Sequence, residues 1–193
     1  MKPVDGEPHA ENGESREVRD KADASRRNSR LATPTDLDPA DVEKVAKALN
    51  GCLADSFVLY MKIKNFHWHM SGPNFRDYHE MLDDHAEAVF GTIDELAERV
   101  RKIGARTLTS LSDALEQSQL VEQTRSDLAP DEMIRELLED NKAVVAGMRK
   151  AHKVCDDAED IASASLLENF VDATEKRCWF LFEIAQSATA TGH

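Results

Sequence analysis

The stretch that decides the fold is Asn74 to Ile103, NFRDYHEMLDDHAEAVFGTIDELAERVRKI. It is rich in Glu, Ala, Leu and Arg, contains no proline, and is followed by Gly104, a residue type that commonly ends helices. We therefore expect one long helix. Its apolar residues recur at helical spacing and form a stripe that should face a core. The stripe comprises Phe75, Tyr78, Leu82, Ala86, Val89, Ile93, Leu96 and Val100.

A second stripe on the same helix carries side chains that can bind a metal. At about 100° per residue, His79, Asp83, Asp94 and Glu98 fall near 0°, 40°, 60° and 100° around the axis. The apolar stripe is centred about 120° away from them. The second stripe therefore lies beside the core face. The alternative interpretation is an ordinary solvated, charged face of an amphipathic helix.

The second stripe consists of two separated pairs. About 15 residues, or about 22 Å, separate the His79/Asp83 pair from the Asp94/Glu98 pair along the axis. One metal ion cannot contact both pairs of one helix. Two copies packed antiparallel about a two-fold axis would bring the first pair of one chain against the second pair of the other. The spacing thus predicts two identical sites per isologous dimer.

Two further histidines stand just upstream, in His67-Trp68-His69. The residues Ser71-Gly72-Pro73 predict a tight turn, which would bring one of these histidines beside His79. A ligand set that mixes imidazole with carboxylates suits iron(II) and would also accept zinc, cobalt or manganese.

The rest of the chain predicts an all-α fold. We expect helices over residues 39–69, 74–103, 131–154 and 161–187, and a short helix over 111–117. Four long helices with one long crossover between the second and third are typical of a ferritin-type bundle. A di-iron centre inside each bundle would use Glu-x-x-His motifs, and none occurs in this sequence.

The segment 66–104 strongly resembles the Dps family of miniferritins, the DNA-binding proteins from starved cells. The signature is His-Trp, a short glycine turn, Asn-Phe, His-Glu-x-x-Asp and then Asp-x-x-x-Glu, and every part is present in register. The resemblance extends over about residues 38–187. It implies a ferroxidase centre between two-fold-related subunits, with ligands from both chains. These are His67, His79 and Asp83 of one chain and Asp94 and Glu98 of the other.

The resemblance also implies a function and an assembly. Members form a homododecamer that is hollow, oxidises Fe(II) with hydrogen peroxide or oxygen, stores ferric mineral and spares DNA from oxidative damage. Trp68, beside the site, would act as a radical sink, or would simply pack at the dimer interface. His69 remains a candidate for a supporting role.

The amino-acid composition indicates which kinds of partner the protein can have. The net charge of −13 argues against a broadly basic, nucleic-acid-coating body and suits attraction of cations. No apolar run has the length of a membrane span and the start is polar, so we expect a cytoplasmic protein, with association with the nucleoid as an option. Cys52, Cys155 and Cys178 form no CxxC pair, which predicts buried, reduced thiols.

We expect three regions: a disordered tail over 1–36, the bundle over 37–188 and a flexible end over 189–193. The tail lacks aromatic residues, and its bases cluster at 26–30. Such a patch can contact DNA phosphates, and the alternative function is therefore a nucleoid DNA-binding protein that uses this tail.

Secondary expectations concern the remaining acids and histidines. His85 and His152 are predicted to be structural, Glu80 and Glu87 to face a cavity, and the acidic turn to line ion pores or to provide solvated helix caps. The acids of that turn are Asp156, Asp157 and Asp160.

Overall fold

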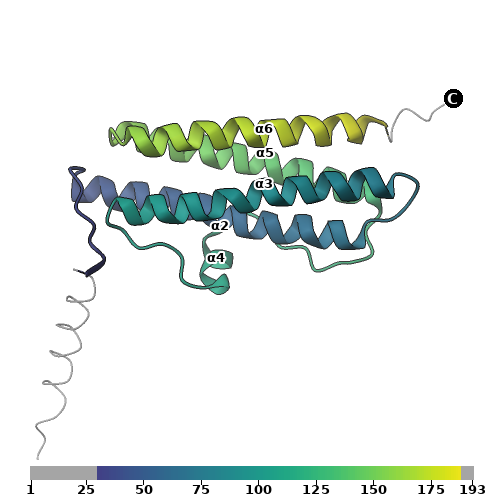
Figure 1. Cartoon of the computed structure of the whole chain (residues 1–193), viewed down its shortest axis with the longest axis horizontal. Coiled ribbons are helices and arrows are strands. Elements are labelled where there is room, and N and C mark those ends of the chain that lie inside the picture. The colour runs from purple at the N-terminus through teal and green to yellow at the C-terminus, as the bar shows by residue number, and fades with distance from the viewer. Residues whose placement is uncertain (1–29, 188–193) are drawn as a thin grey trace, which may run out of the picture.

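The computed structural model describes residues 30–187, and the helices of that region confirm the predicted all-α fold. Two hairpins of long helices, α2 with α3 and α5 with α6, lie side by side and form a four-helix bundle (Figure 1). The short helix α4 sits outside the bundle, within the crossover. The bounds are α2 Pro39–His69, α3 Phe75–Lys102, α4 Leu111–Gln117, α5 Pro130–Asp157 and α6 Ile161–Ser187.

The helix ends follow local chemistry. The Asp38 carboxylate accepts a hydrogen bond of 2.8 Å from the Ala40 amide, and Pro39 occupies the first helical position. Helix α3 stops before Gly104, whose φ of 82° suits a residue without a Cβ. Helix α5 ends later than the predicted residue 154. Its extra turn carries an i,i+4 ion pair between Lys153 and Asp157, with an N–O distance of 2.8 Å.

The apolar stripes meet in one core between the hairpins. The stripe predicted for α3 is buried or half-buried along its length, except at its first residue. Phe75 remains 44% exposed, and its ring packs against that of His79 with centroids 5.0 Å apart. The largest fully buried side chains are Leu49, Leu53, Leu59, Ile63, Phe66, Leu82, Leu96, Ile103, Met133, Ile134, Leu137 and Met148.

Polar side chains at three positions along α2 hold the long crossover between α3 and α5 in place. Asn50 donates a 2.9 Å hydrogen bond to the carbonyl of Arg106 near the start of the crossover. Asp55, which is buried, accepts hydrogen bonds from the Gln119 amide at 2.8 Å and from its side chain at 2.7 Å. Asn65 donates to a later carbonyl at 2.9 Å. These bonds hold α4 against the outer surface of α2.

The last residues of the predicted tail contact the bundle. The Leu31 carbonyl accepts a hydrogen bond of 2.6 Å from Arg101, and a Cβ on Gly104 would lie 2.6 Å from the Thr33 carbonyl oxygen. Residues 1–29 of the predicted tail, which hold all of the basic patch except Arg30, lie outside the described residues, as does the predicted flexible end over 189–193. No helix within residues 30–187 combines the length and the apolar content that a membrane-spanning segment requires.

The three cysteines are free thiols on different helices. Cys52 and Cys155 are buried, and burial raises the pKa of each thiol to about 12, so both are protonated near neutral pH. Cys178 is only half-buried, which departs from the predicted burial because it lies at the edge of the α6 core stripe.

Candidate metal centre

The turn between α2 and α3 brings two histidines into contact. His67 Nδ1 lies 2.9 Å from the carbonyl oxygen of His79, and His79 Nδ1 lies 3.0 Å from the carbonyl oxygen of His67. The two rings are stacked, with centroids 3.7 Å apart and planes 21° from parallel. His67 is buried and His79 is half-buried. This reciprocal pair joins the last turn of α2 to the first turns of α3.

The reciprocal bonds determine which ring nitrogens remain free. A carbonyl oxygen can only accept a hydrogen bond, so Nδ1 of both His67 and His79 must carry the proton and donate it. In a neutral imidazole the Nε2 atom then keeps its lone pair. Histidine ligands of metals are commonly oriented in this way by an Nδ1–H bond to a backbone carbonyl. Both rings therefore hold the tautomer that a metal bound through Nε2 requires.

Asp83 lies next to this histidine pair. Its Oδ1 atom is 3.9 Å from His67 Nε2 and 2.7 Å from Lys64 Nζ. The Lys64 ammonium, through its hydrogen bond and its charge, holds the pKa of the Asp83 carboxyl below its usual value. The carboxylate is therefore ionised at neutral pH and already has a cation beside it. Lys64 was not among the residues predicted for the site, although its position three residues before His67 places it on the same side of α2.

Removing the Lys64 cation should strengthen metal binding. In Lys64→Met, a divalent metal no longer competes with the ammonium for Asp83, and we expect affinity to rise about two- to fivefold, as for loss of an exposed ion pair. Cobalt(II) absorbance under anaerobic conditions would measure it. Lys153→Met removes an equal charge from the exposed pair with Asp157, far along the chain, and should leave affinity unchanged. Equal or weaker cobalt binding by Lys64→Met would contradict the competition.

The other two predicted ligands lie toward the far end of α3. Asp94 and Glu98 are exposed, and Glu98 forms an i,i+4 ion pair with Lys102 at 3.0 Å. Within residues 30–187, no three His, Cys, Asp or Glu side chains of this chain meet the spacing that a metal ion needs. One chain brings His67, His79 and Asp83 toward each other. It leaves Asp94 and Glu98 about 22 Å away along the helix.

We call the His67/His79/Asp83 group and the Asp94/Glu98 pair the two half-sites. An aromatic residue lies between them on the same face of α3. Phe90 is at about 20° on the scale that places His79 at 0°, so it falls within the ligand stripe. The ring is 58% exposed and contacts Tyr60 of α2, with centroids 5.3 Å apart. Phe90 was not among the residues predicted to have a role. The signal was available, because a large apolar residue interrupts an otherwise acidic stripe.

The two residues that follow His67 are both exposed. Trp68 is 58% exposed, and the Lys64 ammonium lies 5.9 Å from its ring centroid. His69 is exposed and its Nδ1 donates to the Asn65 carbonyl at 2.8 Å, within its own helix. The structure therefore brings only His67 of the two upstream histidines beside His79.

The secondary predictions have mixed outcomes. His152 is paired with Glu168 at 3.1 Å, in keeping with a structural role. His85 is buried as predicted, yet its Nδ1 atom has no hydrogen-bond partner in the described part of the chain. Glu80 is exposed and pairs with Arg76 at 2.8 Å. Glu87 is exposed on α3, and its cavity-facing role stays a prediction.

The acidic turn separates into two kinds of residue. Asp156 and Asp157 are exposed, whereas Asp160 is only 3% exposed. The Asp160 carboxylate accepts hydrogen bonds from the Ser163 amide at 3.1 Å and from Arg99 at 2.6 Å. It caps the start of α6 and ties α6 to α3. The predicted pore lining is therefore wrong for Asp160, because a buried, fully engaged carboxylate cannot face a channel, and its cap is buried instead of solvated.

Comparison with known proteins identifies the family of the chain. Residues 46–189 match the ferritin-like domain family. The chain is 37% identical over 137 residues to a DNA protection during starvation protein of Brevibacillus brevis, which covers 71% of this chain and 91% of that protein. The chain belongs to the Dps family.

Solved Dps structures share the fold. A crystal structure of a Dps protein from Bacillus brevis superimposes with a TM-score of 0.73 at 34% identity, over 77% of this chain and 99% of that one. A Dps protein from Vibrio cholerae, described as a member of a broad superfamily of ferritin-like diiron-carboxylate proteins, gives a TM-score of 0.74 at 27% identity, over 79% and 96% of the two chains. The predicted ferritin-like bundle is confirmed, and iron is the metal associated with this superfamily.

Proposed function

We propose that this Dps chain oxidises Fe(II) at sites shared by two copies and stores the ferric product inside a hollow homododecamer. The observation that carries the proposal is the His67/His79 pair, whose Nε2 atoms are both free to bind a metal beside the Asp83 carboxylate. Asp94 and Glu98 of the partner subunit would complete each site. Iron enters as the substrate.

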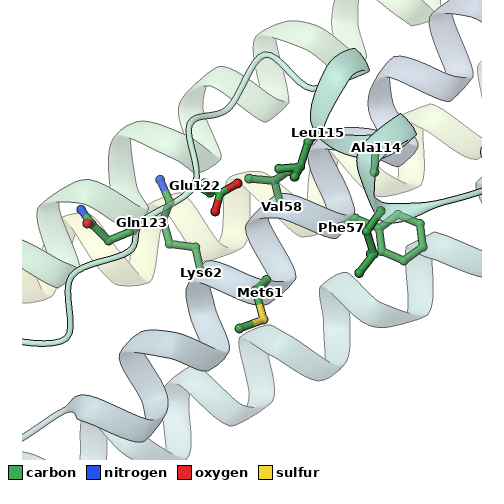
Figure 2. Close-up of a pocket in the computed structure, with 9 residues that line it drawn as sticks. Phe57, Val58, Met61, Lys62, Ala114, Leu115, Glu122 and Gln123 are labelled. Carbon is green, nitrogen blue, oxygen red and sulfur yellow. The ribbon is translucent and has the colours of Figure 1, made fainter.

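The exposed apolar surface supports the dimer. Phe90 and Met61, which are 58% and 55% exposed, lie midway along the α2–α3 face. A neighbouring groove is formed where α4 crosses α2, and Figure 2 shows Met61, Phe57 and Leu115 at its walls. Large apolar side chains grouped on one face are typical of a subunit interface. A two-fold axis through this face would place the half-sites of two copies opposite each other.

The ligand set suits the redox step. Each site would combine two neutral imidazoles with up to three carboxylates, and the negative charge stabilises Fe(III) more than Fe(II). In the overall reaction two Fe(II) ions give one electron each to hydrogen peroxide, which takes up two protons and leaves as two water molecules. Oxygen would serve as an alternative acceptor. Trp68 directly follows the candidate ligand His67 in the sequence. Its role as a radical sink remains a prediction.

A direct assay tests the proposal. Anaerobic addition of Fe(II) followed by hydrogen peroxide should produce ferric absorbance at a rate that rises with protein concentration, and the ferric iron should elute with the protein in gel filtration. His152→Ala, which removes a surface histidine away from α2 and α3, should behave like wild type. Ferric iron that forms at the protein-free rate, or that precipitates apart from the protein, would refute the proposal.

Protection of DNA is the biological role that the relatives suggest. The curated relative is named for DNA protection during starvation. Consumption of Fe(II) and peroxide would provide such protection in the cytoplasm without contact between protein and DNA. Direct DNA binding by the basic patch at 26–30 is the second candidate, supported by that name and by the charge pattern of the tail.

A further inference from the structure

A pocket between α3 and α6 is lined by basic groups that the metal centre does not use. Its volume is about 380 Å³. On the angular scale used above, its α3 residues are centred near 190°, about 140° from the ligand stripe. The pocket thus opens on a different face of α3 from the half-sites. It is lined by Met81, Asp84, His85, Ala88, Ala173, Lys176, Arg177 and Phe180.

Arg177 is a buried cation without a carboxylate partner. It is 4% exposed, and no ion pair joins it to any acid in residues 30–187. Its Nε atom donates to Asn141 Oδ1 at 3.0 Å and its Nη2 atom donates to Thr174 Oγ1 at 2.7 Å. Both acceptors are neutral and buried, so they orient the guanidinium without neutralising it. The Nη1 atom has no partner in the described structure.

A second unpartnered donor lines the same pocket from the opposite helix. His85 Nδ1 on α3 is buried and lacks a hydrogen-bond partner among the described residues. Burial, and then the charges of Arg177 and Lys176, lower the pKa of His85 to about 4. The ring is therefore neutral at pH 7 and can carry its proton on Nδ1. Desolvation likewise lowers the pKa of Arg177 to about 10, because its two hydrogen-bond acceptors are neutral.

Buried polar groups without partners are costly, and a bound group that accepts their hydrogen bonds would remove that cost. From these two orphaned donors we infer that the α3–α6 pocket binds a small oxyanion of the phosphate class. Arg177 Nη1 and His85 Nδ1 would donate to its oxygens from opposite helices. Lys176 would supply a second positive charge at the wall, against the single negative charge of Asp84. An anion would satisfy both donors and neutralise the buried guanidinium.

The test uses metal-free, full-length protein and inorganic phosphate, so it does not depend on iron oxidation. Isothermal titration calorimetry at constant ionic strength, with sodium chloride as the reference salt, would measure affinity and stoichiometry. Three variants are compared with wild type. Arg177→Met removes the charge, Ala173→Leu fills the pocket while leaving Arg177 in place, and Lys47→Met removes an exposed charge on α2 outside the pocket.

We expect one phosphate per chain and a loss of affinity of at least about tenfold in both Arg177→Met and Ala173→Leu, as for loss of a charge-assisted contact. Lys47→Met should bind like wild type. Circular dichroism melting verifies that each variant is folded. If Arg177→Met does not fold, Ala173→Leu alone still tests whether phosphate binds in the pocket. No phosphate binding by wild type, or equal binding by folded Ala173→Leu, would overturn the inference. If Lys47→Met weakened phosphate binding as much as Arg177→Met does, binding would reflect general charge attraction, and this result would also overturn the inference.

Discussion

Co-expressed His79→Ala and Asp94→Ala chains should regain iron oxidation that neither variant shows alone. Each substitution removes one ligand from every site of its own homodimer, and we expect each to slow oxidation by at least about a hundredfold. In a mixed dimer the Asp94→Ala chain supplies an intact His67, His79 and Asp83 half-site. The His79→Ala chain supplies intact Asp94 and Glu98. One of the two sites is then complete, and the other carries both defects.

Random pairing sets the size of the recovery. Half of the dimers are mixed and half of the sites in each mixed dimer are complete, so activity should return to about a quarter of wild type. Different affinity tags on the two chains would allow mixed assemblies to be purified before ferric absorbance is followed. As a control, His79→Ala co-expressed with His67→Ala should stay inactive, because both defects lie in the same half-site. Recovery in that control, or none with Asp94→Ala, would contradict a site shared between chains.

Phe90→Glu should abolish iron oxidation although Phe90 is not a ligand. The substitution places a charge at the centre of the proposed interface, beside carboxylates of the same stripe. Because a two-fold interface contains the residue twice, the loss of two buried rings at about 2 kcal/mol each weakens the dimer by about a thousandfold. Sedimentation velocity would detect the dissociated chain, and circular dichroism should show unchanged helix content.

Phe182→Glu is the matched control, since Phe182 is an aromatic residue of α6 that is 49% exposed and lies away from the α2–α3 face. It should retain iron oxidation. A Phe90→Glu protein that oxidises iron at the wild-type rate would rule out the proposed placement of the two-fold axis.

The architecture was predictable because it depends on local signals. The spacing of apolar residues gave the helices, and the residues at their ends gave the bounds, as at Asp38 and Gly104. The bounds 111–117 and 161–187 agree with the structure to the residue. The positions of the candidate ligands along and around α3 were also predictable, since the rise and twist of a helix convert residue numbers into positions.

Contacts between helices were not predictable in the same way. The reciprocal bonds of His67 and His79 depend on how closely two backbones approach across a turn, and no periodicity encodes that distance. The Lys64 ion pair with Asp83 depends on the rotation of α2 against α3. Asp160 looked like one more surface acid, and only the packing of Arg99 against it shows why it is buried.

Both proposed half-sites have ligands on the one uninterrupted helix α3, so this helix sets the distance and the angle between them in the proposed dimer. A single residue inserted between Asp83 and Asp94 would turn one half-site by about 100° and would disable both sites of a dimer at once. Seven inserted residues would nearly restore the phase and move the two sites about 10 Å farther apart than they are now, with each still complete. The helix can therefore change length only by steps that nearly restore this phase, such as about seven or eleven residues, so its length should be far more constrained than that of the crossover.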